Sequence, residues 1–154
     1  MINHNDSIRC TNVISRKYRF HYKEMEAALS DFTNDVVKLN ATIKGPLFYS
    51  LNNIPKDEIM NVEFFMPVKE DKVDIYDDML FQSYFNIENT ISICIHNEFE
   101  TNTEVGYKIL FDYMEQKHLR QVTPIFHVMS GDQTMQYVFI KIGVTQEDIK
   151  EIWK

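Results

Sequence analysis

The sequence predicts an α+β domain made of two βαββ repeats, in which an antiparallel sheet carries two main helices on one face. Three observations lead to this prediction. Apolar residues recur every three to four positions in two segments, as in amphipathic helices. Other segments alternate apolar and polar residues, as half-buried strands do. The segments follow the same order in both halves of the chain, and Gly45-Pro-Leu-Phe-Tyr49 matches Thr123-Pro-Ile-Phe-His127 at equivalent positions.

The first repeat is expected at about residues 8–69 of a single domain that spans 1–154. Its first strand is rich in β-branched and aromatic residues, and its helix shows an apolar stripe from Met25 to Leu39. The expected elements are a strand at 8–20, a helix at 22–39, a turn at Gly45-Pro46, a strand at 47–51, a hairpin loop at 52–57 and a strand at 61–69.

The second repeat is expected at about 79–144, after a charged linker at about 70–78 that lacks any periodicity. Thr101 and Glu104 fit a capping box, in which a hydroxyl and a carboxylate satisfy the free N–H groups at a helix start. The expected elements are strands at 80–85 and 90–96, a helix to about residue 118, a strand at 124–129, a turn at 130–133, a strand at 135–144 and a short C-terminal helix at 146–153.

Composition excludes several classes of function. The 23 acidic and 16 basic residues give a net charge of -7, which argues against nucleic-acid binding because that affinity depends on Lys and Arg. No apolar run approaches the ~20 residues that span a bilayer, so we expect no membrane insertion. Cys10 and Cys94 cannot build a disulfide framework, which favours a cytoplasmic location. Only four glycines are present, too few for a Gly-rich phosphate loop.

The two faces of the predicted sheet differ in composition. Alternation places Val138, Ile140 and Ile142 on one face with the apolar residues of the 61–69 strand, and this aliphatic face is expected under the helices. The other face mixes aromatic and charged side chains, as ligand grooves do. A partly exposed face, or one covered by a second subunit, would have the same composition. The residues of this second face are Glu63, Phe65, Tyr137, Phe139 and Lys141.

Tyr49 and His127 occupy equivalent places in the two repeats. If a pseudo-twofold axis relates the repeats, both side chains approach one central region, where they suit ligand hydrogen bonds or, with a partner, acid–base chemistry. The alternative is a satisfied core pair near a sheet seam. Glu63 could bind a cation if it is buried among apolar residues. The complete candidate groove is Tyr49, Glu63, Phe65, His127, Tyr137, Phe139 and Lys141.

We expect no catalytic residues, no metal and no cofactor. Cys94 and His96 share a strand face, but a zinc site needs at least three protein ligands, and the remaining candidate, His127, is distant in the sequence. The chain has no G-x-S-x-G elbow. Cys94 lies in an isoleucine-rich strand, where a buried thiol is unreactive. An enzyme is therefore the least favoured function.

The βαββ pair resembles the GyrI-like fold, the effector-binding domain of some multidrug-sensing regulators. This resemblance implies a pseudo-symmetric sheet that carries both helices, with a central groove for amphipathic small molecules. The sequence departs from those relatives in two ways. The groove acid of the drug sensors lies on a strand of the second repeat, but residues 125–129 and 135–144 contain no Asp or Glu. The Glu and Tyr pair of the related ring-opening hydrolases has no matching positions.

A closer resemblance covers nearly the whole chain. ATIKGPLFYSLNNIPKDEIMNVEFFMP (41–67) and LRQVTPIFHVMSGDQTMQYVFIKIGV (119–144) resemble an uncharacterised family of Gram-positive bacteria. Genes of that family tend to lie beside LXG-type toxins of the type VII secretion system. The resemblance implies a small cytoplasmic accessory protein whose partner is an LXG-type toxin or one of the toxin's small helical partner proteins.

Two functional hypotheses follow from these observations. The first is a non-enzymatic accessory or adaptor protein of a type VII secretion toxin system, acting by protein binding. The second is a stand-alone GyrI-like protein that binds an amphipathic small molecule in the aromatic groove.

Overall fold

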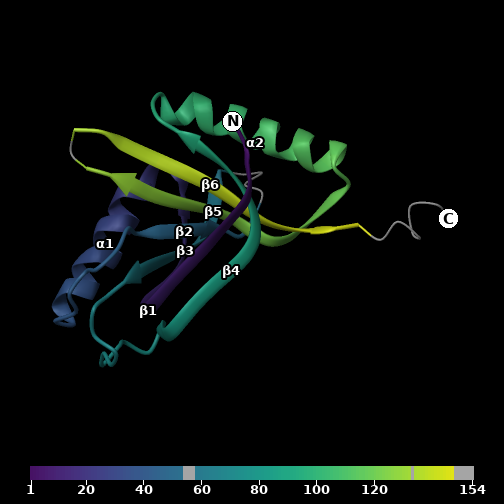
Figure 1. Cartoon of the computed structure of the whole chain (residues 1–154). Helices are drawn as coiled ribbons and strands as arrows, with labels where there is room; N and C mark the ends of the chain where they lie inside the picture. Colours follow the sequence, from purple (N-terminus) through teal and green to yellow (C-terminus); the bar gives the residue numbers. More distant parts are fainter. Residues whose placement is uncertain (54–57, 133, 148–154) are drawn as a thin grey trace. The chain divides into compact units, whose positions relative to one another are not determined.

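The computed structural model describes residues 1–53, 58–132 and 134–147. In these residues the chain forms an α+β fold of mostly antiparallel strands with two α-helices, as the sequence predicts (Figure 1). The elements are β1 (Asn3–His21), the 3-10 turn η1 (Tyr22–Glu24), α1 (Met25–Lys38), β2 (Phe48–Leu51), β3 (Ile59–Pro67), β4 (Met79–Ile95), α2 (Phe99–Gln116), β5 (Leu119–Gly131) and β6 (Gln136–Gln146).

The chain divides into two units. The first unit is Ile8–Asn86, which holds most of β1, then α1, β2, β3 and the first half of β4. The second unit joins Met1–Ser7 to Ile87–Lys154 and holds the second half of β4, then α2, β5 and β6. Each unit thus contains the predicted order of strand, helix, strand, strand.

β3 is the middle strand of the antiparallel sheet in the first unit. Its pairing with β1 runs from Val13 opposite Pro67 to His21 opposite Ile59, and β2 pairs along its other edge. Branched and aromatic side chains dominate these strands because such residues pack well on a pleated surface. Alternation sends every second side chain of β3 toward α1.

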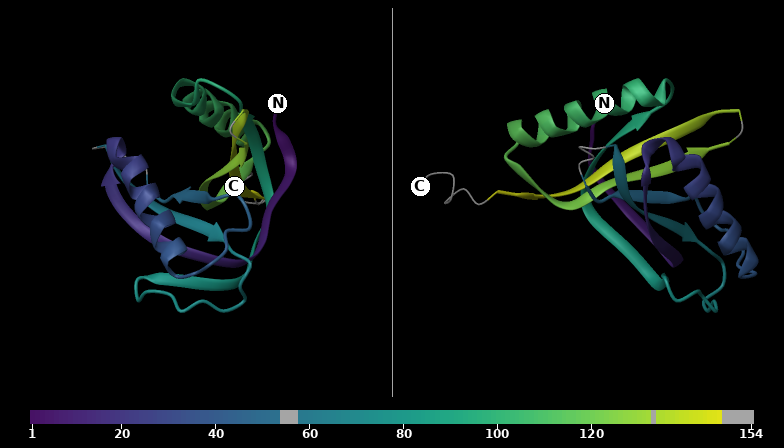
Figure 2. Two further views of the ribbon diagram at one scale, coloured as in Figure 1. Left: turned by 90° about the vertical axis from the view of Figure 1, so that its left-hand side faces the viewer. Right: turned by 180° about the vertical axis from the view of Figure 1, so that it is seen from behind.

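α1 covers one face of this sheet (Figure 2). Phe32 and Val36 of its apolar stripe are fully buried, and the Phe32 ring stacks on Phe64 with ring centroids 5.7 Å apart. The prediction that the aliphatic face of β3 packs under a helix is therefore confirmed in this unit. The buried core residues are Ile14, Phe20, Phe32, Val36, Val62, Phe64, Met66, Val68 and Met79.

Arg16 of β1 connects α1 to the segment between β3 and β4. Its guanidinium bonds to Asp35 of α1 at 2.7 Å and to Asp78 at 2.9 Å, and its side chain is only 9% exposed. Residues 70–78, which the sequence predicts to be a linker, contain no helix or strand. Because Arg16 binds a carboxylate on each side, the end of this irregular segment is fixed to the helix.

β6 is the middle strand of the antiparallel sheet in the second unit. Ile142 lies opposite Ile91 of β4 on one edge and opposite Ile125 of β5 on the other. The β5 register shifts between Gln121 and Ile125, so this edge contains a bulge-like irregularity that increases local twist.

α2 approaches this sheet closely because Gly106 faces it. A Cβ atom at Gly106 would lie 3.2 Å from a methyl group of Ile95 and 3.3 Å from one of Ile140. The prediction that the Val138, Ile140 and Ile142 face packs under a helix is confirmed. The buried core residues are Ile91, Ile93, Ile95, Leu110, Met114, Ile140 and Ile142, with Val138 partly buried against them.

The first residues of β1 join the second unit through Asp6 and Ser7. The Asp6 carboxylate accepts a hydrogen bond from the Ser92 hydroxyl at 2.7 Å and lies 3.2 Å from the Lys141 ammonium, which also donates to the Ser7 carbonyl. Burial acts to raise the pKa of Asp6, but these bonds outweigh burial and lower it. The pairing therefore stabilises the ionised carboxylate.

Two details of the predicted elements were wrong: the division of β4 into two strands and the capping box at the start of α2. The strands expected at 80–85 and 90–96 are parts of the single strand β4, because the exposed polar residues between them hide the alternation. The capping box is absent: α2 begins at Phe99, so Thr101 already lies inside the helix. Near the helix start, the Asn102 amide instead donates to the Asn97 carbonyl at 2.8 Å.

Parts of three other expected elements lie outside the described residues. These are positions 54–57 of the hairpin loop, position 133 of the turn and positions 148–153 of the C-terminal helix. The first position of that expected helix, Gln146, is the last residue of β6.

Candidate ligand-binding site

The candidate groove residues of the first unit lie on opposite faces of its sheet. Tyr49 lies opposite Phe64 and faces α1, with their ring centroids 6.0 Å apart. Burial raises the pKa of the Tyr49 hydroxyl to about 12. Glu63 and Phe65 alternate onto the other face. The first unit therefore does not group Tyr49 with the two residues expected beside it.

Phe65 belongs to an aromatic cluster on the face away from α1. Its ring stacks on Phe48 with centroids 4.7 Å apart and lies 5.1 Å from the ring of Phe85. Only 4% of Phe65 is exposed, so it offers little surface to a ligand. Glu63 is half-buried and lies opposite Lys17 of β1.

His127 is the counterpart of Tyr49 in the second unit. It lies opposite Ile140 and so faces α2, where its Nε2 atom shares a 2.6 Å hydrogen bond with the Tyr107 hydroxyl. The side chain is buried, and burial lowers the pKa of the imidazole to about 4. His127 is therefore neutral at pH 7, and its geometry is that of a hydrogen-bonded core residue.

Tyr137, Phe139 and Lys141 share the face of β6 that points away from α2. The Tyr137 ring meets the His96 ring edge-on, with centroids 5.4 Å apart. The Lys141 ammonium lies 5.7 Å from the centroid of the Phe139 ring, but it is already paired with Asp6. Lys141 thus has a structural partner.

The alternative metal ligands do not converge. Cys94 lies opposite Phe139, on the sheet face away from α2, whereas His127 faces α2. Among the residues that the structure describes, no group of three or more His, Cys, Asp or Glu side chains could hold a metal ion.

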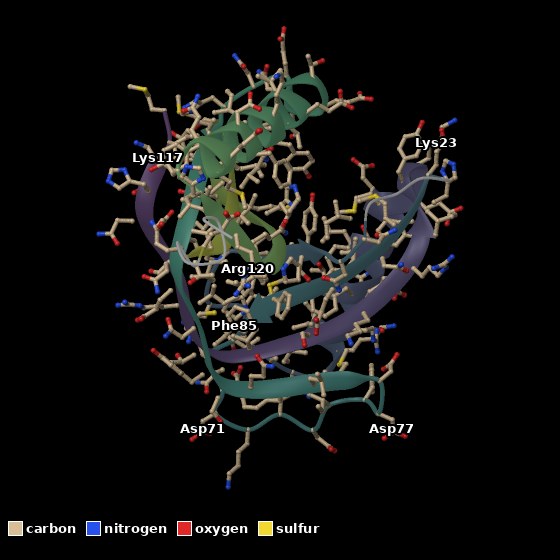
Figure 3. All side chains as sticks on the ribbon, turned by 90° about the vertical axis from the view of Figure 1, so that its right-hand side faces the viewer. Lys23, Asp71, Asp77, Phe85, Lys117 and Arg120 are labelled. Atoms are coloured by element: carbon tan, nitrogen blue, oxygen red, sulfur yellow. The ribbon has the colours of Figure 1, made fainter. Side chains whose placement is uncertain are left out.

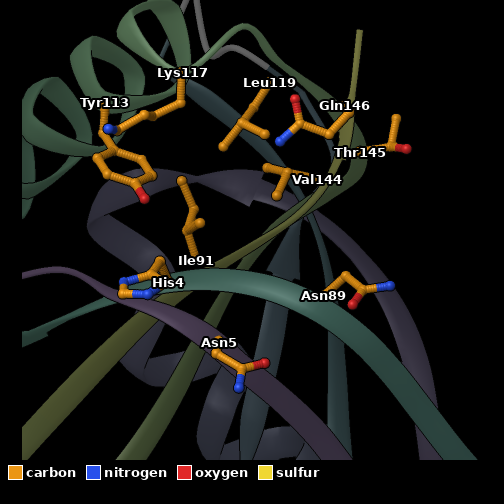
Figure 4. Close-up of a pocket in the computed structure, with 10 residues that line it drawn as sticks. All are labelled: His4, Asn5, Asn89, Ile91, Tyr113, Lys117, Leu119, Val144, Thr145 and Gln146. Atoms are coloured by element: carbon orange, nitrogen blue, oxygen red, sulfur yellow. The ribbon is translucent and has the colours of Figure 1, made fainter. Parts of the chain in front are cut away.

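A pocket in the second unit brings together residues that the sequence did not single out (Figure 4). Its volume is about 470 Å³, which lies within the range of roughly 300–1,000 Å³ typical of small-molecule sites. Its lining comes from β1, β4, the end of α2, β5 and β6. Five segments that are distant in sequence therefore converge on one site.

The inner part of the pocket is apolar. Ile91, Leu119 and Val144 line it from the three strands, and Tyr113 contributes its ring from α2 (Figure 4). Ile91 is buried, while the other three are only half-buried. The pocket is thus an extension of the hydrophobic core of the second unit that solvent can reach.

The pocket lies where α2 ends. α2 ends at Gln116, Lys117 caps it, and His118 adopts a φ of 56° that turns the chain into β5. Leu119, the first residue of β5, pairs with Gln146, the last residue of β6. The pocket is therefore built where the helix and these two strands all have an end.

The outer part of the pocket is polar. It includes His4, Asn5, Asn89, Lys117 and Gln146, all of which are exposed. Figure 3 shows Lys117 at the end of α2. Within the described parts of the chain, the side chains of Asn89, Lys117 and Gln146 have no hydrogen bond or ion pair. Their donors are available to a ligand.

No local signal in the sequence marks this pocket. Alternation correctly places Val144 and Ile91 on the helix-facing side of the sheet. It cannot show which helix and strand ends meet, because that depends on the lengths of elements that pair in three dimensions. The polar residues around the rim are isolated surface positions in the sequence.

The chain belongs to the family described as Domain of unknown function (DUF5085), which matches residues 9–146. No protein of curated function matches the sequence. None of the described helices is long and apolar enough to cross a membrane.

Solved structures with a similar fold include those of EcmrR. The chain is 15% identical to EcmrR in a complex with DNA, with a TM-score of 0.76 over 96% of this chain, and spans 58% of that protein. Against the isolated C-terminal domain of EcmrR, the identity is 13% and the TM-score 0.69, over 93% of this chain and 98% of the domain.

Two other structures share the fold at lower similarity. A hydrolase from Listeria innocua is 13% identical, with a TM-score of 0.56 over 92% of this chain and 91% of the hydrolase. SAV2435, solved with bound tetraphenylphosphonium, is 9% identical, with a TM-score of 0.52 over 96% of both chains. These likenesses show a GyrI-like fold. The similarities described above do not link the chain to LXG toxins or type VII secretion, so that link stays a prediction.

Proposed function

We propose that this member of the DUF5085 family binds a small amphipathic molecule in the pocket of the second unit. The observation that carries the proposal is the pocket itself, about 470 Å³ in volume with an apolar interior and a polar rim. The GyrI-like fold supports it, because SAV2435 has that fold and holds tetraphenylphosphonium.

The pocket is a better candidate than the aromatic face expected from the sequence. On that face Phe65 is buried against Phe48, and Lys141 is paired with Asp6. In the pocket, Leu119, Val144 and Tyr113 retain solvent-exposed apolar surface that a ligand can cover. A ligand contact that covers about 200 Å² of apolar surface, counted on both molecules, gains roughly 5 kcal/mol before the costs of association. Since a dissociation constant of about 1 mM corresponds to about 4 kcal/mol, we expect millimolar rather than micromolar affinity.

A pair of substitutions on β6 tests this proposal. Val144→Trp places a large side chain into the pocket, whereas Gln136, an exposed residue of β6, does not line it, so Gln136→Trp is the matched control. The probes are tetraphenylphosphonium and tetraphenylborate, two ions of similar shape, and the measurement is titration calorimetry. We expect Val144→Trp to weaken the binding of whichever probe binds by at least about tenfold, since a filled pocket excludes the apolar body.

The control variant Gln136→Trp should bind the probes as the natural protein does. The proposal is wrong if neither probe binds saturably at millimolar concentration, or if Val144→Trp binds as tightly as Gln136→Trp. Thermal unfolding of each variant confirms that it is folded, and a bound ligand should raise the unfolding temperature of the natural protein.

A second candidate function is the accessory role in type VII secretion, in the cytoplasm, with an LXG-type toxin or its helical partner as the bound protein. The observation that favours it is a pair of exposed apolar residues one turn apart on α2, Val105 at 49% and Ile109 at 40% exposure. Co-purification with a co-expressed LXG toxin tests this role. A stoichiometric complex that Val105→Lys disrupts would support it, and recovery of the chain alone would contradict it.

A further inference from the structure

The residues that line the pocket include bases but, among the described residues, no acids. Lys117 and His4 are the lining residues that can carry a positive charge, and no Asp or Glu lines the pocket in the described residues. In the chain as a whole, acidic residues outnumber basic ones by 23 to 16. The pocket therefore departs from the acidic character of the chain.

Lys117 is available to a ligand. Its ammonium forms no ion pair with any residue that the structure describes. Lys108 on the same helix, in contrast, is paired with Asp112 at 3.2 Å. Figure 4 shows the Lys117 side chain bent back along α2, with its ammonium end on the same side of the pocket as the Tyr113 ring.

The neighbouring amides can also serve an anion. Asn89 and Gln146 each carry an NH₂ group with two donors, and neither side chain has a hydrogen-bond partner in the described part of the chain. N–H groups stabilise an anionic oxygen through charge-assisted hydrogen bonds. An oxyanion above the apolar interior would thus find donors on more than one side.

The C-terminal end of α2 repels an anion only weakly. A helix C-terminus carries about half a negative charge, spread over its unpaired carbonyls. Two of these carbonyls, those of Tyr113 and Glu115, already accept hydrogen bonds from the backbone N–H groups of Lys117 and His118. The full positive charge of Lys117 therefore outweighs the partial negative charge of the helix end.

We propose that the pocket selects amphipathic molecules whose polar group is anionic, such as a carboxylate or a sulfonate, over cationic ones. This inference rests on the proposed function of the same pocket. The size of the preference is limited by the exposure of Lys117, because ion pairs at the surface are weak and are screened by salt. We expect Lys117 to contribute about three- to fivefold.

The test compares tetraphenylborate with tetraphenylphosphonium, which differ in the sign of their charge and little in shape. The quantity measured is the ratio of the two dissociation constants, because the ratio cancels their shared apolar contribution. Lys117→Gln removes the charge, Lys117→Glu reverses it, and Lys108→Gln removes a charge of α2 that does not line the pocket. Each protein is titrated at low and high salt.

We expect the natural protein to bind the borate more tightly than the phosphonium. The preference should fall about three- to fivefold in Lys117→Gln, fall further in Lys117→Glu and stay unchanged in Lys108→Gln. It should also shrink at high salt. The inference is overturned if Lys117→Gln leaves the ratio unchanged, or if the natural protein prefers the phosphonium, while Val144→Trp still abolishes binding. If Val144→Trp has no effect on either probe, the proposed function itself fails.

Discussion

His127 and Lys117 differ in how much of their hydrogen-bonding capacity the fold uses. His127 is buried and shares a hydrogen bond with Tyr107, and this bond connects β5 to α2. Lys117 is exposed and has no ion pair in the described residues. A polar residue that the core has already satisfied contributes to stability, whereas an unpaired one beside apolar surface can contribute to binding.

The buried His127 should make the protein sensitive to acid. An unfolded chain binds a proton at the ordinary histidine pKa of 6.5, whereas folded His127 does so only near pH 4. The free energy of unfolding therefore falls as the pH is lowered from 6.5 to 4, by about 2 kcal/mol at pH 5. Urea denaturation at pH 7 and pH 5 should show this loss in the natural protein and a smaller loss in His127→Gln.

Exposed His4 provides the control for that measurement. His4→Gln should keep the pH dependence of the natural protein, because it leaves His127 in place. A natural protein whose stability is the same at pH 7 and pH 5 would show that His127 is protonated in the folded state, contrary to its burial.

At the scale of the elements, the packing of α2 on its sheet depends on a small residue. The Cβ of any larger residue at position 106 would lie 3.2 Å from Ile95 and 3.3 Å from Ile140. We expect Gly106→Val to lower the free energy of unfolding by about 2 kcal/mol, because its branched side chain overpacks this contact. Chemical denaturation measures the change. Glu104→Val, an exposed position on the same helix, should cost about 0.5 kcal/mol, and equal losses in the two variants would show that α2 does not pack closely at residue 106.

The sequence predicts the helices and strands well where one buried face produces a regular spacing of apolar residues. The apolar stripe of α1 and the alternation in β3 and β6 arise from one buried face, and both were read correctly. β4 was divided in two because residues 88–89 are polar and exposed. The start of α2 was misplaced because the Thr101 motif is equally compatible with a position inside a helix. The spacing of apolar residues is informative only where one face of the element packs against another element.

At the scale of the whole chain, the second unit draws on both ends of the sequence. Met1–Ser7 belongs to it, although Ile8–Asn86 of the first unit intervenes. Asp6 and Ser7 hold Lys141 of β6. Periodicity alone does not predict which residues of the candidate groove share a unit. Its members divide between the two units: Tyr49, Glu63 and Phe65 lie in the first, and His127, Tyr137, Phe139 and Lys141 lie in the second.

Removal of residues 1–7 should therefore destabilise the second unit selectively. Lys141, whose side chain is 14% exposed, would lose its carboxylate partner, and an unpaired, largely buried charge is costly. Hydrogen exchange should accelerate in the second half of β4 and in β6, but not in β3 of the first unit. Equal acceleration in β3 and β6 would show that the two units unfold together, and no acceleration would show that residues 1–7 contribute nothing.

The bond between Ser7 and Lys141 also has a consequence for synthesis on the ribosome. The two residues are 134 positions apart in the sequence, which corresponds to roughly 7–27 s of translation at about 5–20 residues per second. The contacts of β1 with β6 therefore cannot form until almost the whole chain has been synthesised. During that interval the apolar residues of β4 and α2 lack the strand that will cover them, and the nascent chain should be a substrate for chaperones until β6 has left the exit tunnel.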